Sequence, residues 1–290
     1  MVDLQQIAPS CDSANPSDIL VLQVAYDGSG YSGFALQEKQ AHVKTVAGEL
    51  QGALQVFLKR PVTFTCSGRT DAGVHALRQY VSIPLIEGEF EEVRRRHVLR
   101  AMSALLPDDI RVIGVFHASS DFSARFSAVA RVYRYRMCLG GVPSLFNARW
   151  SWWVRPRDGR PLSVEAMVEA SRYLIGEHDF ASFCKSESAV GKPTCRFVES
   201  IDFRQEQSLG ESLLSVQIVG NAFLHSMVRT IIGTLVEVGF GKKDPSWVSD
   251  VLLACDRRCA GPTAPACGLT LWDVRYPEGS LVPVEVFDAH

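Results

Sequence analysis

The chain has 290 residues, of which 47% are hydrophobic and 21% are charged, and its formal net charge is −2 at pH 7. This composition is typical of a soluble globular protein with one large core or two modest ones, and the charge argues against a nucleic-acid binder that relies on unspecific attraction. No apolar run approaches the roughly 20 residues that a membrane span needs. Residues 1–17 contain no Lys or Arg, unlike a secretory or mitochondrial leader. We expect a disordered tail over residues 1–17 of a cytoplasmic protein.

The first half of the chain, residues 18–120, predicts a β-α-β-β-α-β order. Apolar residues keep helical spacing after Thr45, whose side chain can cap a helix, and Pro61 lies beyond the end of that helix. The expected elements are strands at Ile19–Tyr26, Val62–Cys66, Gln79–Ile83 and Ile110–Phe116, a helix that ends at Leu58 and a second helix from about Glu91 to Leu106.

The second half, residues 121–290, predicts the same order with one helix added. In its first strand, Arg131–Cys138, arginines alternate with Tyr133 and Tyr135, so we expect one aromatic face and one basic face. The other expected elements are strands at Phe197–Arg204, Leu213–Val219 and Leu269–Val274, and helices at Ser163–Ile175, Phe223–Val238 and Asp244–Leu253.

The repeated order predicts an α+β protein with two ferredoxin-like, or RNP-like, halves. We expect residues 18–120 to form an N-terminal α+β domain and residues 121–290 a C-terminal one. Each half would be an antiparallel sheet with helices on one face, and RNA-recognition modules hold nucleotides on the free face of such a sheet. Two halves would form a central RNA-binding cleft between their sheets. Because such folds have many functions, the fold alone does not identify the activity.

The run Ser67–Ala76 lies between two predicted strands and presents Asp71. Gly68 and Gly73 flank this aspartate and allow a close approach of the backbone to a ligand, while Arg69 favours the ionised carboxylate. The pattern is typical of an ionised aspartate offered to a ligand. An aspartate that only stabilises a turn is the alternative.

The segment Gly68–His75 resembles the signature of the tRNA pseudouridine synthase A family. The resemblance continues over most of Asp18 to Pro277. The other segments that carry it are Tyr26–Gly33, Phe122–Ala128 with Tyr133–Tyr135, Gly176–Phe180, Asn221–Arg229 and Gly268–Leu269.

This resemblance implies an isomerase that converts uridine to pseudouridine in the anticodon stem-loop of tRNA, at positions about 38 to 40. It implies no cofactor and a homodimer in which tRNA contacts both subunits. The chemistry agrees, because moving ribose from N1 to C5 of the same uracil needs neither a redox partner nor a metal. A non-catalytic RNA-binding module on the same fold is the alternative. The joint presence of Asp71, Tyr133, Arg69 and Arg229 favours the enzyme.

The resemblance also implies roles for these four residues. Asp71 would be the nucleophile, and attack on ribose C1′ or on uracil C6 both remain open. Tyr133 would stack on the uracil while its hydroxyl acts as an acid or a base. Arg229, in an apolar helix, needs a charged partner, which the resemblance identifies as Asp71. Arg69 would help to open the stem.

The remaining candidate contacts concern substrate binding. Arg125 and Phe126, in the second matching segment, are candidates together with Tyr133. His75 is a further candidate, although its place in the sequence favours a structural role. Basic residues also cluster at Arg94–Arg96, where a solvated helix face is the alternative to a phosphate contact.

The eight cysteines include no Cys-x-x-Cys pair, so we predict no metal site. A metal-dependent enzyme built on Cys255, Cys259 and Cys267 is a distant alternative. The chain departs from the family pattern at Phe34–Leu36, at Ala47 and at Ser103–Leu105. None of these positions touches the expected chemistry, but they leave the preferred uridine open.

Overall fold

A computed structural model describes residues 18–37, 43–156, 161–185 and 191–286. The predicted tail of residues 1–17 lies outside the described residues. The strands are β1 (Asp18–Tyr26), β2 (Thr65–Cys66), β3 (His75–Leu85), β4 (Ile110–Ala118), β5 (Ala130–Cys138), β6 (Trp152–Trp153), β7 (Gly176–Asp179), β8 (Cys195–Ser208), β9 (Glu211–Gly220), β10 (Leu269–Arg275) and β11 (Val282–Val286). The α-helices are α1 (Val46–Leu58), α2 (Glu89–Arg95), α3 (Val98–Leu105), α4 (Val164–Ser171), α6 (Met227–Gly239) and α7 (Trp247–Ala254).

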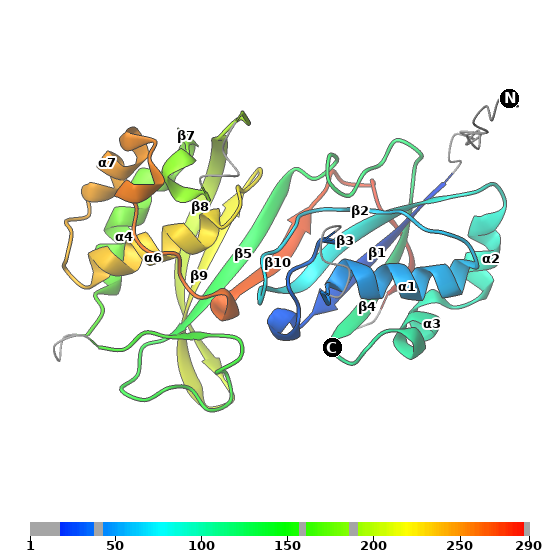
Figure 1. Cartoon of the computed structure of the whole chain (residues 1–290), viewed down its shortest axis with the longest axis horizontal. Helices are drawn as coiled ribbons and strands as arrows, with labels where there is room; N and C mark the ends of the chain where they lie inside the picture. Colours follow the sequence, from blue (N-terminus) through cyan, green and yellow to red (C-terminus); the bar gives the residue numbers. More distant parts are fainter. Residues whose placement is uncertain (1–17, 38–42, 157–160, 186–190, 287–290) are drawn as a thin grey trace, which may run out of the picture.

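The strands form one eleven-stranded sheet in the order β11-β4-β1-β3-β10-β5-β9-β8-β7, with β2 on β3 and β6 on β5. Helices α1 to α3 accompany β1, β3 and β4, whereas α4, α6 and α7 accompany the strands of the second half (Figure 1). The predicted α+β class is confirmed, since most strand pairs are antiparallel.

The two halves join edge to edge in one continuous sheet. The expectation of two separate sheets was therefore wrong. Strand β10 lies between the halves, antiparallel to β5 and parallel to β3, where Thr270 faces His75. Strand β11 adds to the far side of the first half by pairing with β4. Strands β10 and β11 belong to the second half of the sequence but pair with strands of the first half. The domain boundary after residue 120 therefore remains a proposal.

Local backbone geometry shortens or divides several predicted elements. The expected helix Glu91–Leu106 is divided at His97, whose φ of 49° is left-handed. The second part, α3, starts where the backbone N–H groups of Val98 and Leu99 donate to the carboxylate of Glu285 on β11, both at 3.2 Å. This carboxylate caps the helix from a distant strand. The strand expected over Val62–Cys66 has only two residues, and the helix expected over Ser163–Ile175 ends in a 3-10 turn.

The two faces of β5 differ as its alternation predicts. Tyr133, Tyr135 and Met137 are buried in the core that also contains the apolar faces of α1, α4 and α6. Arg134 and Arg136 lie on the opposite face of the strand. The helices therefore cover the face that carries the tyrosines.

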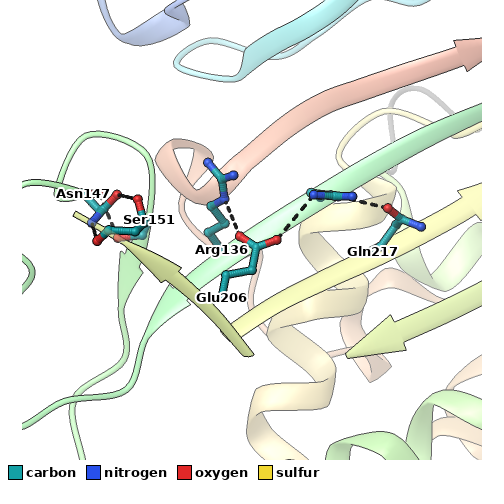
Figure 2. A network of polar contacts seen from close by, with 7 residues as sticks. Arg136, Asn147, Ser151, Glu206 and Gln217 are labelled. Carbon is teal, nitrogen blue, oxygen red and sulfur yellow. Dashed lines mark hydrogen bonds and ion pairs between the residues drawn. The ribbon is translucent and has the colours of Figure 1, made fainter. Parts of the chain in front are cut away.

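The face opposite to the helices carries a network of paired charges (Figure 2). Glu206 accepts from Arg136 at 3.1 Å and lies 3.4 Å from Arg134, which also donates to Gln217 at 2.9 Å. The guanidinium of Arg134 stacks on the ring of Trp272 at 3.8 Å. Arg134 and Arg136 therefore already have partners within the protein, on the face of the sheet that was expected to be free to bind RNA.

Candidate active site

The loop of residues 67–74, between β2 and β3, carries Asp71. Its backbone is held by the segment that includes and follows β1. Phe34 N donates to Thr70 O at 3.1 Å, and the hydroxyl groups of Tyr26 and Thr70 are 2.8 Å apart. The loop therefore has a defined position relative to β1, as a residue that must meet a substrate requires.

The carboxylate of Asp71 is held by three side chains from the start of α6. Its Oδ2 accepts from Ser226 Oγ at 2.8 Å and from Arg229 Nη1 at 2.9 Å. Its Oδ1 lies 3.2 Å from His225 Nε2. The side chain of Asp71 is 19% exposed and that of Arg229 is 18% exposed. One carboxylate oxygen is thus engaged twice, while the other faces a half-exposed imidazole.

Arg229 is itself fixed by the segment that crosses α6. Its Nε donates to Ala264 O at 2.8 Å, and Ala264 N donates back to Arg229 O at 3.0 Å. This segment packs closely on the helix because Gly233 has no side chain: a Cβ at this position would lie 1.7 Å from Pro262 O. The guanidinium is therefore oriented toward Asp71 before any substrate arrives, which the resemblance predicts for this pair.

Sequence reasoning missed Ser226 and His225 as partners of Asp71. It placed both residues inside a helix over Phe223–Val238, whereas α6 starts only at Met227. The reason is Ser226, whose φ of 60° is left-handed and breaks the helical path. The available signal was the pair of polar residues, His and Ser, in an otherwise apolar run.

Replacing Ser226 should separate its hydroxyl from its backbone. Ser226→Ala and Ser226→Gly both remove the bond to Asp71, and we expect turnover to fall about tenfold in each, as one hydrogen bond to a charged group is lost. Only the glycine variant tolerates φ at 60° without strain, so its melting temperature should exceed that of the alanine variant. Steady-state turnover of both variants tests the first expectation, and their melting curves test the second. A Ser226→Gly protein with wild-type turnover would show that the hydroxyl is dispensable.

Tyr133 lies on β5 and is 8% exposed. Its ring meets Phe223 edge to face at a centroid distance of 5.1 Å. Burial raises the pKa of Tyr133, and the negative charge of Asp71 raises it further. A raised pKa keeps the hydroxyl protonated at neutral pH, so it is in the form that can donate a proton. A Cβ on Gly68 would lie 3.8 Å from the Tyr133 hydroxyl, so this loop residue lies directly over it.

A cavity of about 780 Å³ opens between the two halves over Asp71 and Tyr133. Among its described lining residues, Asp71 is the one carboxylate. The cationic residues of the lining are Arg69, Arg125, Arg131, Lys192 and Arg196. The volume lies in the range of small-molecule sites, and the excess of positive charge suits a polyanion.

The structure brings most of the predicted site residues together. The residues of that set that line the cavity are Asp71, Arg69, Arg125 and Tyr133, and Arg229 holds Asp71 from beside it. Phe126 is 80% exposed, with the Arg125 guanidinium 5.3 Å from its ring. Two of the residues that depart from the family pattern, Ala35 and Leu36, also line the cavity.

His75 is not among the described residues that line the cavity, and it is only 3% exposed. Its Nδ1 accepts from Gly28 N at 3.1 Å and lies 3.1 Å from Asp27 Oδ1. Burial lowers the pKa of His75 despite the nearby carboxylate, so the ring is neutral at physiological pH. This position fits the structural role left open for His75.

Within the described ranges, no group of three or more His, Cys, Asp or Glu side chains is arranged to hold a metal ion. Cys255 and Cys259 are exposed and Cys267 is half-buried. No helix in the described part of the chain is long and apolar enough to cross a membrane.

Comparison with known proteins gives consistent matches. A family model described as tRNA pseudouridine synthase matches residues 170–277. The chain is 40% identical to tRNA pseudouridine synthase A of Methylococcus capsulatus, over 89% of this chain and 90% of the relative. It is 39% identical to the protein of that name from Thermus thermophilus, over 91% of this chain and 99% of the relative. Among solved structures, the crystal structure of a Cbf5-Nop10-Gar1 complex aligns at 13% identity with a TM-score of 0.34, over 78% of this chain and 46% of that chain.

Proposed function

This chain belongs to the tRNA pseudouridine synthase A family, and we therefore propose that it isomerises uridine at positions about 38 to 40, in the anticodon stem-loop of tRNA. Membership makes it an isomerase that forms pseudouridine in tRNA. The observation that carries the proposal for the site is Asp71, an oriented carboxylate in a cavity whose cationic lining residues outnumber it five to one.

The proposed reaction moves ribose C1′ from N1 to C5 of one uracil and transfers one proton from C5 to N1, so no atom is gained or lost. Asp71 is the proposed nucleophile, forming a transient bond to ribose C1′ or to uracil C6. The C1′–N1 bond breaks, C1′ joins C5, and the bond to Asp71 breaks again. Arg229 and Ser226 occupy Oδ2, so Oδ1, which lies 3.2 Å from His225 Nε2, is the proposed attacking oxygen. The protonated hydroxyl of Tyr133 is the proposed proton donor to N1, and the phenolate so formed takes the proton released from C5, which restores the hydroxyl. The ring of Tyr133 supports the uracil.

Arg69 and Arg125 have proposed roles in substrate binding. Both are exposed at the cavity, where their guanidinium groups can meet phosphates. Extruding a base from a stem costs a few kcal/mol. Arg69, two residues before Asp71 on the same loop, is the proposed side chain that holds the stem open, and the exposed ring of Phe126 offers a stacking surface.

A non-catalytic RNA-binding module on the same fold is the competing function. Such a module would gain nothing from a carboxylate among cations that meet phosphates, because like charges repel. The three side chains that hold Asp71 favour the enzyme.

We also propose that the protein acts in the cytoplasm as a homodimer. The five cations of one cavity can neutralise only a few phosphates, so a folded tRNA would need further contacts, which a second subunit can supply. Light scattering of the purified protein, alone and with tRNA, measures this. A monomer in both states contradicts the dimer.

The decisive experiment is to incubate the purified protein with unmodified tRNA in excess chelator and to map pseudouridine along the product. We expect product at positions 38 to 40 only, and none when these uridines are replaced by cytidine. Product elsewhere contradicts the proposed position. Tight tRNA binding without any product supports the binding module, and activity that requires added zinc supports the cysteine site.

The salt dependence of tRNA affinity should identify which cations meet phosphates. Each phosphate contact contributes about 0.7 to 0.9 to the slope of log affinity against log salt. Replacing Arg69, Arg125 and Lys192 by Gln should lower this slope by about 2. Replacing Arg94–Arg96 is the matched control, because Arg94 and Arg96 pair with glutamates of the same helix. Equal slopes for wild type and the cavity variant contradict this assignment.

A further inference from the structure

We propose that Arg131 is a positioning residue for this reaction, which sets the separation of the two segments that meet at Asp71. The inference rests on the proposed function, because it treats Asp71 as the reacting group. Arg131 lies on β5, two residues before Tyr133 and on the same face of the strand, and it lines the cavity.

All five N–H groups of the Arg131 guanidinium donate to backbone carbonyl oxygens. Ser67 O accepts from Nε at 3.3 Å and from Nη2 at 3.0 Å. Arg125 O accepts from Nη2 at 2.6 Å. Ala128 O and Asn221 O accept from Nη1 at 3.2 and 2.6 Å. The side chain thus ties together three segments that are far apart in the sequence.

Two of these segments carry the groups at the reacting carboxylate. Ser67 opens the loop that carries Asp71, four residues further on. Asn221 follows β9 and opens the segment that reaches Ser226, whose hydroxyl donates to Asp71 at 2.8 Å. Arg131 therefore joins the loop that carries the carboxylate to the segment that holds it, and both to the strand of Tyr133.

The charge of Arg131 also lacks a carboxylate partner in the described part of the chain, although the side chain is partly buried. Among the described residues, it forms no ion pair with a carboxylate, unlike Arg134 on the same strand, which pairs with Glu206. Burial lowers the pKa of the Arg131 guanidinium, although it remains charged at any physiological pH. Partial burial of this positive charge costs desolvation free energy that no carboxylate offsets. The five hydrogen bonds to backbone carbonyls offset it instead, as expected of a side chain that holds these segments together.

A lysine at position 131 could not make these five hydrogen bonds, and this difference between lysine and arginine provides the test. Its ammonium has three donors at one point, whereas the planar guanidinium reaches carbonyls on several sides. Arg131→Lys therefore keeps the charge and loses the geometry, whereas Arg131→Met loses both. Arg134→Lys, on the opposite face, is the matched control for the exchange itself.

We expect Arg131→Lys to lower the single-turnover rate at saturating enzyme by about 100-fold, the effect of misplacing reacting groups by about 1 Å. Its tRNA dissociation constant should change less than threefold, and Arg134→Lys should match wild type in both. Arg131→Met should lose as much rate and also bind tRNA more weakly. The melting temperature of each variant is measured first, and all assays are run well below the lowest of these temperatures, so that only folded protein is compared.

The outcomes separate this inference from the proposed function. If wild type forms no pseudouridine, the proposed function fails and the inference with it. If wild type turns over and Arg131→Lys matches it, only the positioning role is wrong and the charge alone suffices. The inference is also wrong if Arg131→Lys loses rate only in proportion to weaker tRNA binding or to lost folded protein. If Arg131→Lys does not fold, Arg131→Gln under the same assays decides between these outcomes.

Discussion

Asp71→Asn should abolish pseudouridine formation while tRNA binding stays close to wild type. The substitution keeps the size of the side chain and an oxygen that can accept from Ser226 and Arg229. It removes the negative charge and the nucleophile, so no covalent step can start. Removing the one carboxylate among the described lining residues, which include five cations, should not weaken the attraction of the cavity for phosphate. Quantification of pseudouridine after long incubation, with tRNA binding measured in parallel, tests both parts.

The control for this prediction is Asp273→Asn, which makes the same exchange in the ion pair with Arg78 at 3.3 Å. This variant should retain wild-type turnover. If Asp71→Asn still isomerises uridine at a tenth of the wild-type rate, the whole effect on the barrier is only about 1.4 kcal/mol. The carboxylate would then not be the essential catalyst. Melting curves are needed, because the substitution leaves the charge of Arg229 without its partner.

Tyr133→Phe should lower turnover by about 100-fold or more, with tRNA affinity nearly unchanged. The ring and its edge-to-face contact with Phe223 remain, so the base keeps its support. Only the hydroxyl is lost, which is the proposed proton donor. Because burial and the charge of Asp71 raise the pKa of Tyr133, the wild-type hydroxyl stays protonated throughout pH 6 to 9. Its titration should therefore add no step to the wild-type rate profile in this interval.

Tyr135→Phe is the matched control on the same strand. The hydroxyl of Tyr135 donates to Pro265 O at 2.8 Å and lies outside the cavity lining. Its loss should cost about 1 kcal/mol of stability and leave turnover unchanged. Turnover close to wild type in Tyr133→Phe would reduce Tyr133 to a stacking residue. An equal loss of turnover in both variants would indicate a general disturbance of β5.

The sequence by itself determined the α+β class, most of the strands and the loop that carries Asp71. The alternation in Arg131–Cys138 is a local property, since a strand places successive side chains on opposite faces whatever its neighbours are. The aromatic and basic faces of β5 were therefore predictable. The pairing of Asp71 with Arg229 was predictable from the family resemblance and from the cost of an unpaired charge in an apolar helix.

Only the tertiary structure decided how the two halves join and what surrounds the carboxylate. The insertion of β10 between β3 and β5 depends on backbone hydrogen bonds, which every non-proline residue can make and no side-chain pattern specifies. The five bonds of Arg131 end on backbone carbonyls for the same reason. The contacts of Ser226 and His225 with Asp71 bridge about 150 residues of chain and depend on a left-handed φ that serine rarely adopts. Local periodicity carries no information about such contacts, because they arise only when distant segments pack together.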